Sequence, residues 1–132
     1  MAGGETVIAV GIGCRAGAPA DRIAALVERA LSLISAERQT VILVSHERKA
    51  AEAGLAAAAE QLGLPLRFLP HDAVKAADGG TVTRSSHSLE ATGIASFSEA
   101  AALAGAGPGA RLVLERIVGD GVTCAIAQGE TP

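Results

Sequence analysis

Short apolar runs alternate with helical patterns through the first half of the chain, and this alternation limits the folds open to it. The runs stop at glycine, serine or proline and predict strands at Thr6–Val10, Val41–Val44 and Leu66–Leu69. Between them, apolar residues at helical spacing predict a helix from Pro19 to about Ile34, and an alanine-rich stretch predicts another at Ala50–Leu62, stopped by Gly63. Strands that are separated by helices form parallel sheets with right-handed crossovers.

The last part of the chain predicts a β-hairpin. Two apolar, β-branched runs, Leu112–Val118 and Val122–Ala127, flank the sequence Gly-Asp-Gly, which favours a tight turn. The intervening pattern predicts a helical turn at Asp72–Ala77, a polar loop at Asp78–Ser88, a short helix from Leu89 to Gly93, and a helix at Ser98–Leu103 that is capped by Ser98. Residues 1–132 are therefore predicted to form a single-domain α/β sandwich with a mixed, mainly parallel sheet and a C-terminal β-hairpin.

Composition argues against several classes of partner. The 132 residues include 2% aromatic side chains and carry a formal net charge of −3, so the stacking platforms and basic surface of a nucleic-acid-binding protein are missing. No apolar run approaches the roughly 20 residues needed to cross a bilayer, and no signal peptide is visible. Cys14 and Cys124 do not make a disulfide framework. We expect a cytoplasmic protein with reduced thiols that binds neither nucleic acid nor a membrane.

The sequence Gly-Ile-Gly-Cys-Arg, Gly11 to Arg15, follows the first predicted strand. Ligands of open α/β sheets bind beyond the carboxyl ends of parallel strands, so this segment is a candidate site. Glycine lets backbone amides approach a ligand closely, and the Arg15 guanidinium matches a carboxylate or a phosphate. A tight turn beside a solvated arginine accounts for the same residues equally well.

The same segment fits the dinucleotide-binding pattern Gly-x-Gly-x-x-Ala, from Gly11 to Ala16. Against this pattern, Pro19 places the helix start several residues after the glycines, and no acidic residue follows at the required distance. The sequence has no P-loop. A small nucleotide-binding module is therefore the weaker alternative.

Polar residues also follow the second predicted strand. Ser45 and His46 lie at the strand end, and Lys49 and Glu52 are spaced by three residues, which would place them on one helix face. In one interpretation, Ser45 and Lys49 face the same cleft as Arg15. In the other, Lys49 and Glu52 form a surface ion pair of little energetic value.

A third polar segment lies in the predicted loop at Asp78–Ser88. It holds Arg84, Ser86 and His87, which either bind a polar ligand or face solvent. The histidines of the chain are scattered, and Cys14 has no partner at metal-binding spacing, so we expect no metal site. The neighbouring arginine favours thiolate character at Cys14.

Together these segments resemble one family. The sequences VGIGCRAG, SHERKAAEAGL, GIASFSEAAAL and GDGVTCAIA occur in the order typical of the cobalamin-biosynthesis family of CobE and the C-terminal domain of CbiG, the cobalt-precorrin-5A hydrolase. The resemblance covers Val7 to Ala127. It assigns the family's motif positions to Gly11, Gly13, Cys14, Arg15, Gly17, Ser45, Lys49, Glu52, Gly54, Glu99 and Thr123. Ala16 departs from the family's second basic residue, and Arg116 stands where hydrolase-type sequences tend to have lysine.

The resemblance implies a stand-alone cobalamin (vitamin B12) biosynthesis protein of the aerobic pathway. Such a protein would bind a precorrin or other corrinoid intermediate as a carrier or accessory factor, with other enzymes of the pathway as further partners and no cofactor or metal. Corrin precursors carry many carboxylates, which Arg15, Lys49, Arg84 and Arg116 would complement. The implied ligand-binding residues are Gly11, Gly13, Cys14, Arg15, Ser45, Lys49, Ser86 and Arg116.

Enzymatic activity is the main alternative to binding alone. Hydrolases of the family open a lactone of a precorrin intermediate with loss of acetaldehyde. The chain does not match the N-terminal part of these two-part hydrolases, which favours the binding role. Residue spacing assigns no catalytic residue.

Overall fold

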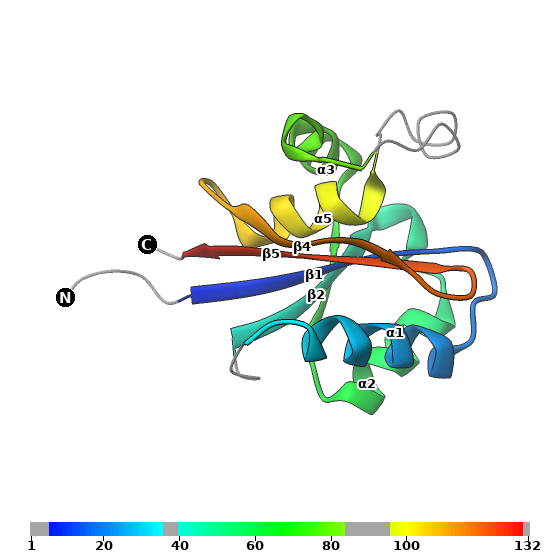
Figure 1. The fold of residues 1–132 in the computed structure, drawn as a ribbon. Coiled ribbons are helices and arrows are strands. Elements are labelled where there is room, and N and C mark those ends of the chain that lie inside the picture. The colour runs from blue at the N-terminus through cyan, green and yellow to red at the C-terminus, as the bar shows by residue number, and fades with distance from the viewer. Residues whose placement is uncertain (1–5, 36–39, 84–95, 131–132) are drawn as a thin grey trace.

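A five-stranded sheet forms the middle layer of the structure (Figure 1). The computed structural model describes residues 6–35, 40–83 and 96–130. Its strands are β1 (Thr6–Cys14), β2 (Val41–His46), β3 (Leu66–Leu69), β4 (Arg111–Val118) and β5 (Val122–Glu130). Its helices are α1 (Ala20–Ser32), α2 (Ala53–Leu62), α3 (His71–Ala76) and α5 (Phe97–Ala106), with 3₁₀ turns η2 (Glu47–Lys49) and η3 (Asp78–Gly80).

The strands lie in the order β3-β2-β1-β5-β4. β2 pairs in parallel with both β1 and β3, whereas β5 pairs antiparallel with both β1 and β4. β5 alone therefore opposes the other strands of the described sheet, and the carboxyl ends of β1, β2, β3 and β4 share one edge. The predicted mixed, mainly parallel sheet with a closing hairpin is confirmed.

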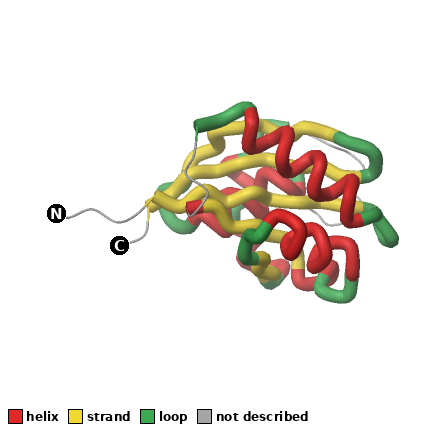
Figure 2. Tube along the Cα trace, turned by 90° about the horizontal axis from the view of Figure 1, so that it is seen from below, coloured by secondary structure: helices red, strands yellow, loops and turns green. Residues whose placement is uncertain are grey.

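The helices cover both faces of the sheet. Helices α1 and α2 lie on one face, and α3 and α5 lie on the other (Figure 1); Figure 2 views the sheet from the α1 and α2 side. The core under α1 and α2 contains large aliphatic side chains such as Ile12, Ile23, Leu43, Leu55 and Ile126. The core under α5 is built mainly from small residues, including Ala9, Ala100, Ala101, Ala102 and Ala127. No helix in the described ranges is long and apolar enough to cross a membrane.

Several element bounds differ from the sequence prediction. Strand β1 continues to Cys14 instead of ending before Gly11, because β5 pairs with it from Thr6 to Cys14. The second helix begins at Ala53 rather than Ala50, since a 3₁₀ turn follows β2 directly.

Helix α5 begins at Phe97, and Ser96 rather than Ser98 is its N-cap residue. Ser98 lies inside the first turn and is fully buried. The helix predicted at Leu89 to Gly93, and the part of the predicted loop after Thr83, lie outside the described residues.

Gly11 explains how α5 lies so close to β1. A Cβ atom at Gly11 would overlap the Ser98 carbonyl oxygen and would lie 2.6 Å from the Ala102 backbone nitrogen. Both obstacles are helix backbone, which cannot rotate away as a side chain would. The absence of a side chain at Gly11 therefore serves helix packing.

We predict that Gly11→Ala lowers the free energy of unfolding by about 3 kcal/mol or more, because the added methyl group meets rigid backbone. Gly79→Ala is the matched control, since a Cβ at Gly79 meets nothing within 4 Å. It should change stability by less than about 0.5 kcal/mol. Urea denaturation of both variants measures the difference, and equal stabilities would contradict the packing role.

Candidate functional site

The carboxyl edge of the sheet gathers the motif residues. The β1–α1 connection and the β4–β5 turn meet there, at the right of Figure 1. A hydrogen bond from the Arg15 backbone N–H to the Gly121 carbonyl oxygen, 3.0 Å long, joins the two segments. The Arg15 side chain is exposed, and Cys14 before it is partly buried.

The glycines of the motif face α5 and not this exposed arginine. Gly11 and Gly13 point to the α5 face of the sheet, where a Cβ at Gly13 would lie 2.7 Å from Thr123 Oγ1 and 3.4 Å from Phe97 Cδ2. Side chains alternate along a strand, so Cys14 points to the opposite face, toward α1 and α2. The glycines were expected in a strand-end loop, but they lie within β1 and admit helix α5 and the Thr123 side chain.

Ser45 lies in the interior of this edge. Its side chain has 0% exposure, and its hydroxyl donates a hydrogen bond of 2.9 Å to the carbonyl oxygen of Ile12. The bond joins β2 to β1 just beyond the last paired residues of the parallel ladder, Gly11 and Val44. In the described structure, Ser45 therefore stabilises the carboxyl end of β1 from a buried position.

Lys49 and Glu52 do not share a helix face. Lys49 lies in η2, and Glu52 is the residue before the first turn of α2, so the expected helical spacing is wrong. The Glu52 carboxylate instead accepts a 2.8 Å hydrogen bond from the Gly17 N–H. Glu52 thus holds the loop that follows Arg15.

Cys14 lies within electrostatic range of both of these residues. Burial raises the pKa of the Cys14 thiol; Lys49 lowers it and Glu52 raises it, with burial the largest influence. The expected thiolate character at Cys14 is therefore wrong. Both thiols are free, and burial raises the pKa of Cys124 to about 12.

Arg116 lies on β4, on the flank of the sheet. Its backbone N–H donates a 2.9 Å hydrogen bond to the carboxylate of Glu99, and it lines a groove of about 530 Å³ together with Val82 and the neighbouring residues of β4. Ser86, Arg84 and His87 lie outside the described residues.

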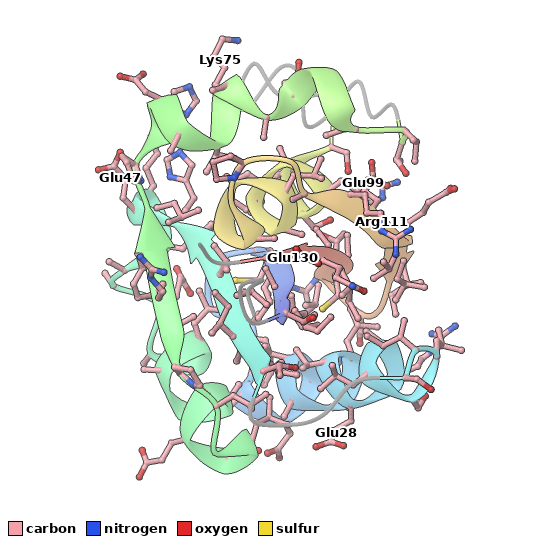
Figure 3. All side chains as sticks on the ribbon, turned by 90° about the vertical axis from the view of Figure 1, so that its left-hand side faces the viewer. Glu28, Glu47, Lys75, Glu99, Arg111 and Glu130 are labelled. Carbon is pink, nitrogen blue, oxygen red and sulfur yellow. The ribbon has the colours of Figure 1, made fainter. Side chains whose placement is uncertain are left out.

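Glu99 is a buried carboxylate in the first turn of α5, between that helix and β4 (Figure 3). It accepts hydrogen bonds from the N–H groups of Val82 and Thr83 at 2.8 and 2.9 Å and from the Thr83 hydroxyl at 2.6 Å, besides the one from Arg116. Burial acts to raise the pKa of Glu99, but the hydrogen bonds from Thr83, Arg116 and Val82 outweigh it and hold the pKa below its ordinary value. The charged carboxylate of Glu99 therefore joins three segments: helix α5, strand β4 and residues 82 and 83.

Two histidines that lie far apart in the sequence, His46 and His71, are neighbours in the structure. His46 is buried, and its Nδ1 accepts a 2.9 Å hydrogen bond from the Arg48 N–H. We therefore assign the ring proton to Nε2, which lies 3.0 Å from Nδ1 of His71 and donates to it. His46 is the last residue of β2, and His71 comes two residues after the end of β3. Their positions at neighbouring strand ends were the signal that could have found the pair.

Among the described residues, the histidine pair is not part of a larger set of metal ligands. Within the described residues, no group of three or more His, Cys, Asp or Glu side chains could hold a metal ion. The assigned proton also occupies Nε2 of His46, the nitrogen that faces its partner. The pair instead ties the start of α3 to the end of β2, beside Phe97.

The fold and the motif at the carboxyl edge define a class: a three-layer α/β domain whose first strand ends in Gly-Ile-Gly-Cys and is followed by arginine. The family described as cobalamin synthesis G C-terminus matches residues 8–127. The chain belongs to this family, and it is a cobalamin-biosynthesis protein.

Individual relatives agree with this assignment. Protein CobE of a Sinorhizobium species is 32% identical over 121 residues, which cover 91% of this chain and 79% of CobE. The crystal structure of a CobE at 1.7 Å resolution superposes with a TM-score of 0.85 at 32% identity, covering 96% of this chain and 93% of that one. The cobalamin biosynthesis protein chiG of Agrobacterium tumefaciens is 43% identical, with a TM-score of 0.70 and coverage of 96% and 100%.

We predict that Ser45→Ala lowers the free energy of unfolding by about 1–3 kcal/mol, because the buried Ile12 carbonyl loses its side-chain donor. Ser32→Ala is the matched control: its hydroxyl also donates to a backbone carbonyl, that of Arg29, but at an exposed site. Its loss should cost less than about 0.5 kcal/mol. Chemical denaturation checks both values, and an equal cost would show that Ser45 has no special supporting role.

The histidine pair predicts a pH dependence of stability. Burial, His71, Arg48 and Lys49 lower the pKa of His46 below its ordinary 6.5, while Glu47 opposes them. Well above pH 6.5, the His46 ring is neutral in both the folded and the unfolded states. Below it, the unfolded state takes up the proton first, so stability falls by up to about 1.4 kcal/mol per pH unit until the folded pKa is reached.

His46→Gln tests this dependence, because glutamine can hydrogen-bond but does not titrate. The free energy of unfolding, measured by urea denaturation between about pH 7.5 and 5, should fall more steeply for the wild type than for the variant. Parallel curves would mean that His46 does not contribute.

We expect a thiol reagent to modify Cys14 of the native protein faster than Cys124. Cys14 is partly exposed at the strand end, whereas Cys124 is fully buried, and burial raises its pKa to about 12. Peptide mass spectrometry after timed alkylation identifies each site. Equal rates, or a native disulfide between the two, would be contrary to the structure.

Proposed function

We propose that this protein binds a corrinoid or precorrin intermediate through its peripheral carboxylates, as a carrier or accessory factor of cobalamin biosynthesis. One observation carries the proposal: two cationic side chains, Arg15 and Lys49, lie at the carboxyl edge without a carboxylate ion-pair partner among the described residues. The family membership supplies the ligand class, because corrin precursors carry many acetate and propionate side chains.

The chemistry of the two cations fits such a ligand. The guanidinium of Arg15 presents a planar set of N–H donors that matches a carboxylate, and Lys49 provides a second positive charge. Local charge, and not the net charge of −3, decides whether an anion approaches this edge. The edge is therefore suited to a polycarboxylate despite the acidic composition.

The other predicted contact residues have different roles in this proposal. Gly11 and Ser45 are buried, so in this proposal they stabilise the strand ends next to the ligand and do not contact it. Arg116 stands apart on β4, next to a groove whose aliphatic walls, including Val82, Leu112 and Ile117, can accept the apolar part of a macrocycle. Ser86 stays a prediction.

Arg15→Ala tests the proposal directly. A charge-assisted hydrogen bond contributes on the order of 1.5–3 kcal/mol, so affinity for a corrin with free side-chain carboxylates, such as cobyrinic acid, should fall roughly 10- to 100-fold. The thermal midpoint should stay nearly unchanged, because the side chain is exposed. Arg29→Ala, an exposed arginine in the last turn of α1 and hence at the opposite edge, is the control.

Absorbance titration is suitable because the chain has no tryptophan or tyrosine. Cobinamide, which has the corrin ring but amides in place of carboxylates, should bind more weakly than cobyrinic acid. If neither corrin binds, or if Arg15→Ala binds as well as the wild type, the proposal fails. Release of acetaldehyde from a precorrin lactone would indicate a hydrolase instead, and binding of a nucleotide but no corrin would indicate a nucleotide-binding module.

A further inference from the structure

The Arg15 side chain lies on the turn between β4 and β5. A Cβ atom at Gly121 would lie 2.7 Å from Nε, 2.9 Å from Cδ and 3.0 Å from Cζ of Arg15. The guanidinium end of the side chain therefore occupies the space that any other residue at position 121 would fill. The backbone of Gly121 also accepts the Arg15 N–H, so both the main chain and the side chain of Arg15 rest on this residue.

The turn beneath Arg15 is braced from two sides. The Gly119 N–H donates a 2.8 Å hydrogen bond to the Val122 carbonyl oxygen, which closes the turn. Asp120 forms an ion pair with Arg22 of α1, and Gly119 lies against Leu26 of the same helix. The turn is thus fixed to α1, and it offers Arg15 a support of defined position.

The same bracing leaves the charge of Arg15 available. Asp120 is the acidic residue of the turn, and it pairs with Arg22 instead of Arg15. A guanidinium has five N–H donors, and no ion pair occupies those of Arg15 among the described residues. Holding a long side chain in place before binding also reduces the conformational entropy that a ligand must overcome.

We infer that Gly121 is a positioning residue of the ligand site. It admits the Arg15 side chain onto the β4–β5 turn and thereby presents the guanidinium to a carboxylate of a tetrapyrrole. The ligand class rests on the function proposed above; the positioning of Arg15 by Gly121 does not.

Gly121→Ala is the test variant, and Gly109→Ala is its control. The two glycines have nearly the same strained backbone, with φ of 74° and 78°, but a Cβ at Gly109 meets nothing within 4 Å. Both variants should lose thermal stability through the backbone. Only Gly121→Ala should weaken cobyrinic acid binding, by about tenfold or more, because it displaces Arg15.

A double variant separates positioning from general damage. In the Arg15→Ala background, Gly121→Ala should change the affinity by less than about twofold, because the group that it positions is already absent. If Gly121→Ala weakens binding equally with and without Arg15, or does not weaken it in the wild type, the inference is overturned.

A measurement without ligand keeps this inference distinct from the proposed function. The Arg15 Nε–H should show a heteronuclear NOE well above that of the exposed Arg29 in the wild type and in Gly109→Ala, and should drop to the Arg29 level in Gly121→Ala. An Arg15 side chain as mobile as Arg29 in the wild type, or equally ordered in Gly121→Ala, would refute the positioning role. A wild type that binds no corrin but shows the expected NOE pattern would refute only the proposed function.

Discussion

The backbone of α5 lies directly on the middle of the sheet, and the remaining arrangement follows from this contact. Glycine occupies the places where helix and strand meet: Gly11 lies under Ser98 and Ala102, and Gly129 lies under the carbonyl of Ala106. Most of the other buried residues on this face are alanines. Small residues that let helix and sheet approach closely explain how a chain with 2% aromatic side chains still buries a core on both sides of its sheet.

The close approach of α5 also explains why a carboxylate is buried beside it. Glu99 enters the interior with the first helical turn, where the partial positive charge of the helix N-terminus favours an anion. The donors around it are two backbone N–H groups of residues 82 and 83, the Thr83 hydroxyl and the Arg116 N–H. In the part of the chain that the structure describes, these hydrogen bonds stabilise the charge, and they join α5 to β4 and to residues 82 and 83.

Periodicity and turn chemistry were enough to predict the strands, the parallel order and the closing hairpin, because these signals are local. Pairing is not local: β5 extends β1 through Gly11 and Gly13 to Cys14, which no pattern around the glycines could reveal. For the same reason the sequence did not show that Ser45 donates to Ile12 or that His46 meets His71. The candidate ligand site at the carboxyl edge stays a prediction, and only the structure shows that Gly11 and Ser45 are buried there while the Arg15 side chain is exposed.

Two hydrogen bonds and one ion pair engage the acidic residues at the carboxyl edge of the sheet. The carboxylate of Glu52 binds the Gly17 N–H, and that of Glu47 binds the His71 N–H. Asp120 pairs with Arg22. Each of these acids holds a loop or a turn of the edge in place, so none forms an ion pair with Arg15 or Lys49 in the described structure. The network that shapes the edge therefore leaves Arg15 and Lys49 without a carboxylate ion-pair partner among the described residues, and the proposed binding of a carboxylate ligand depends on this arrangement.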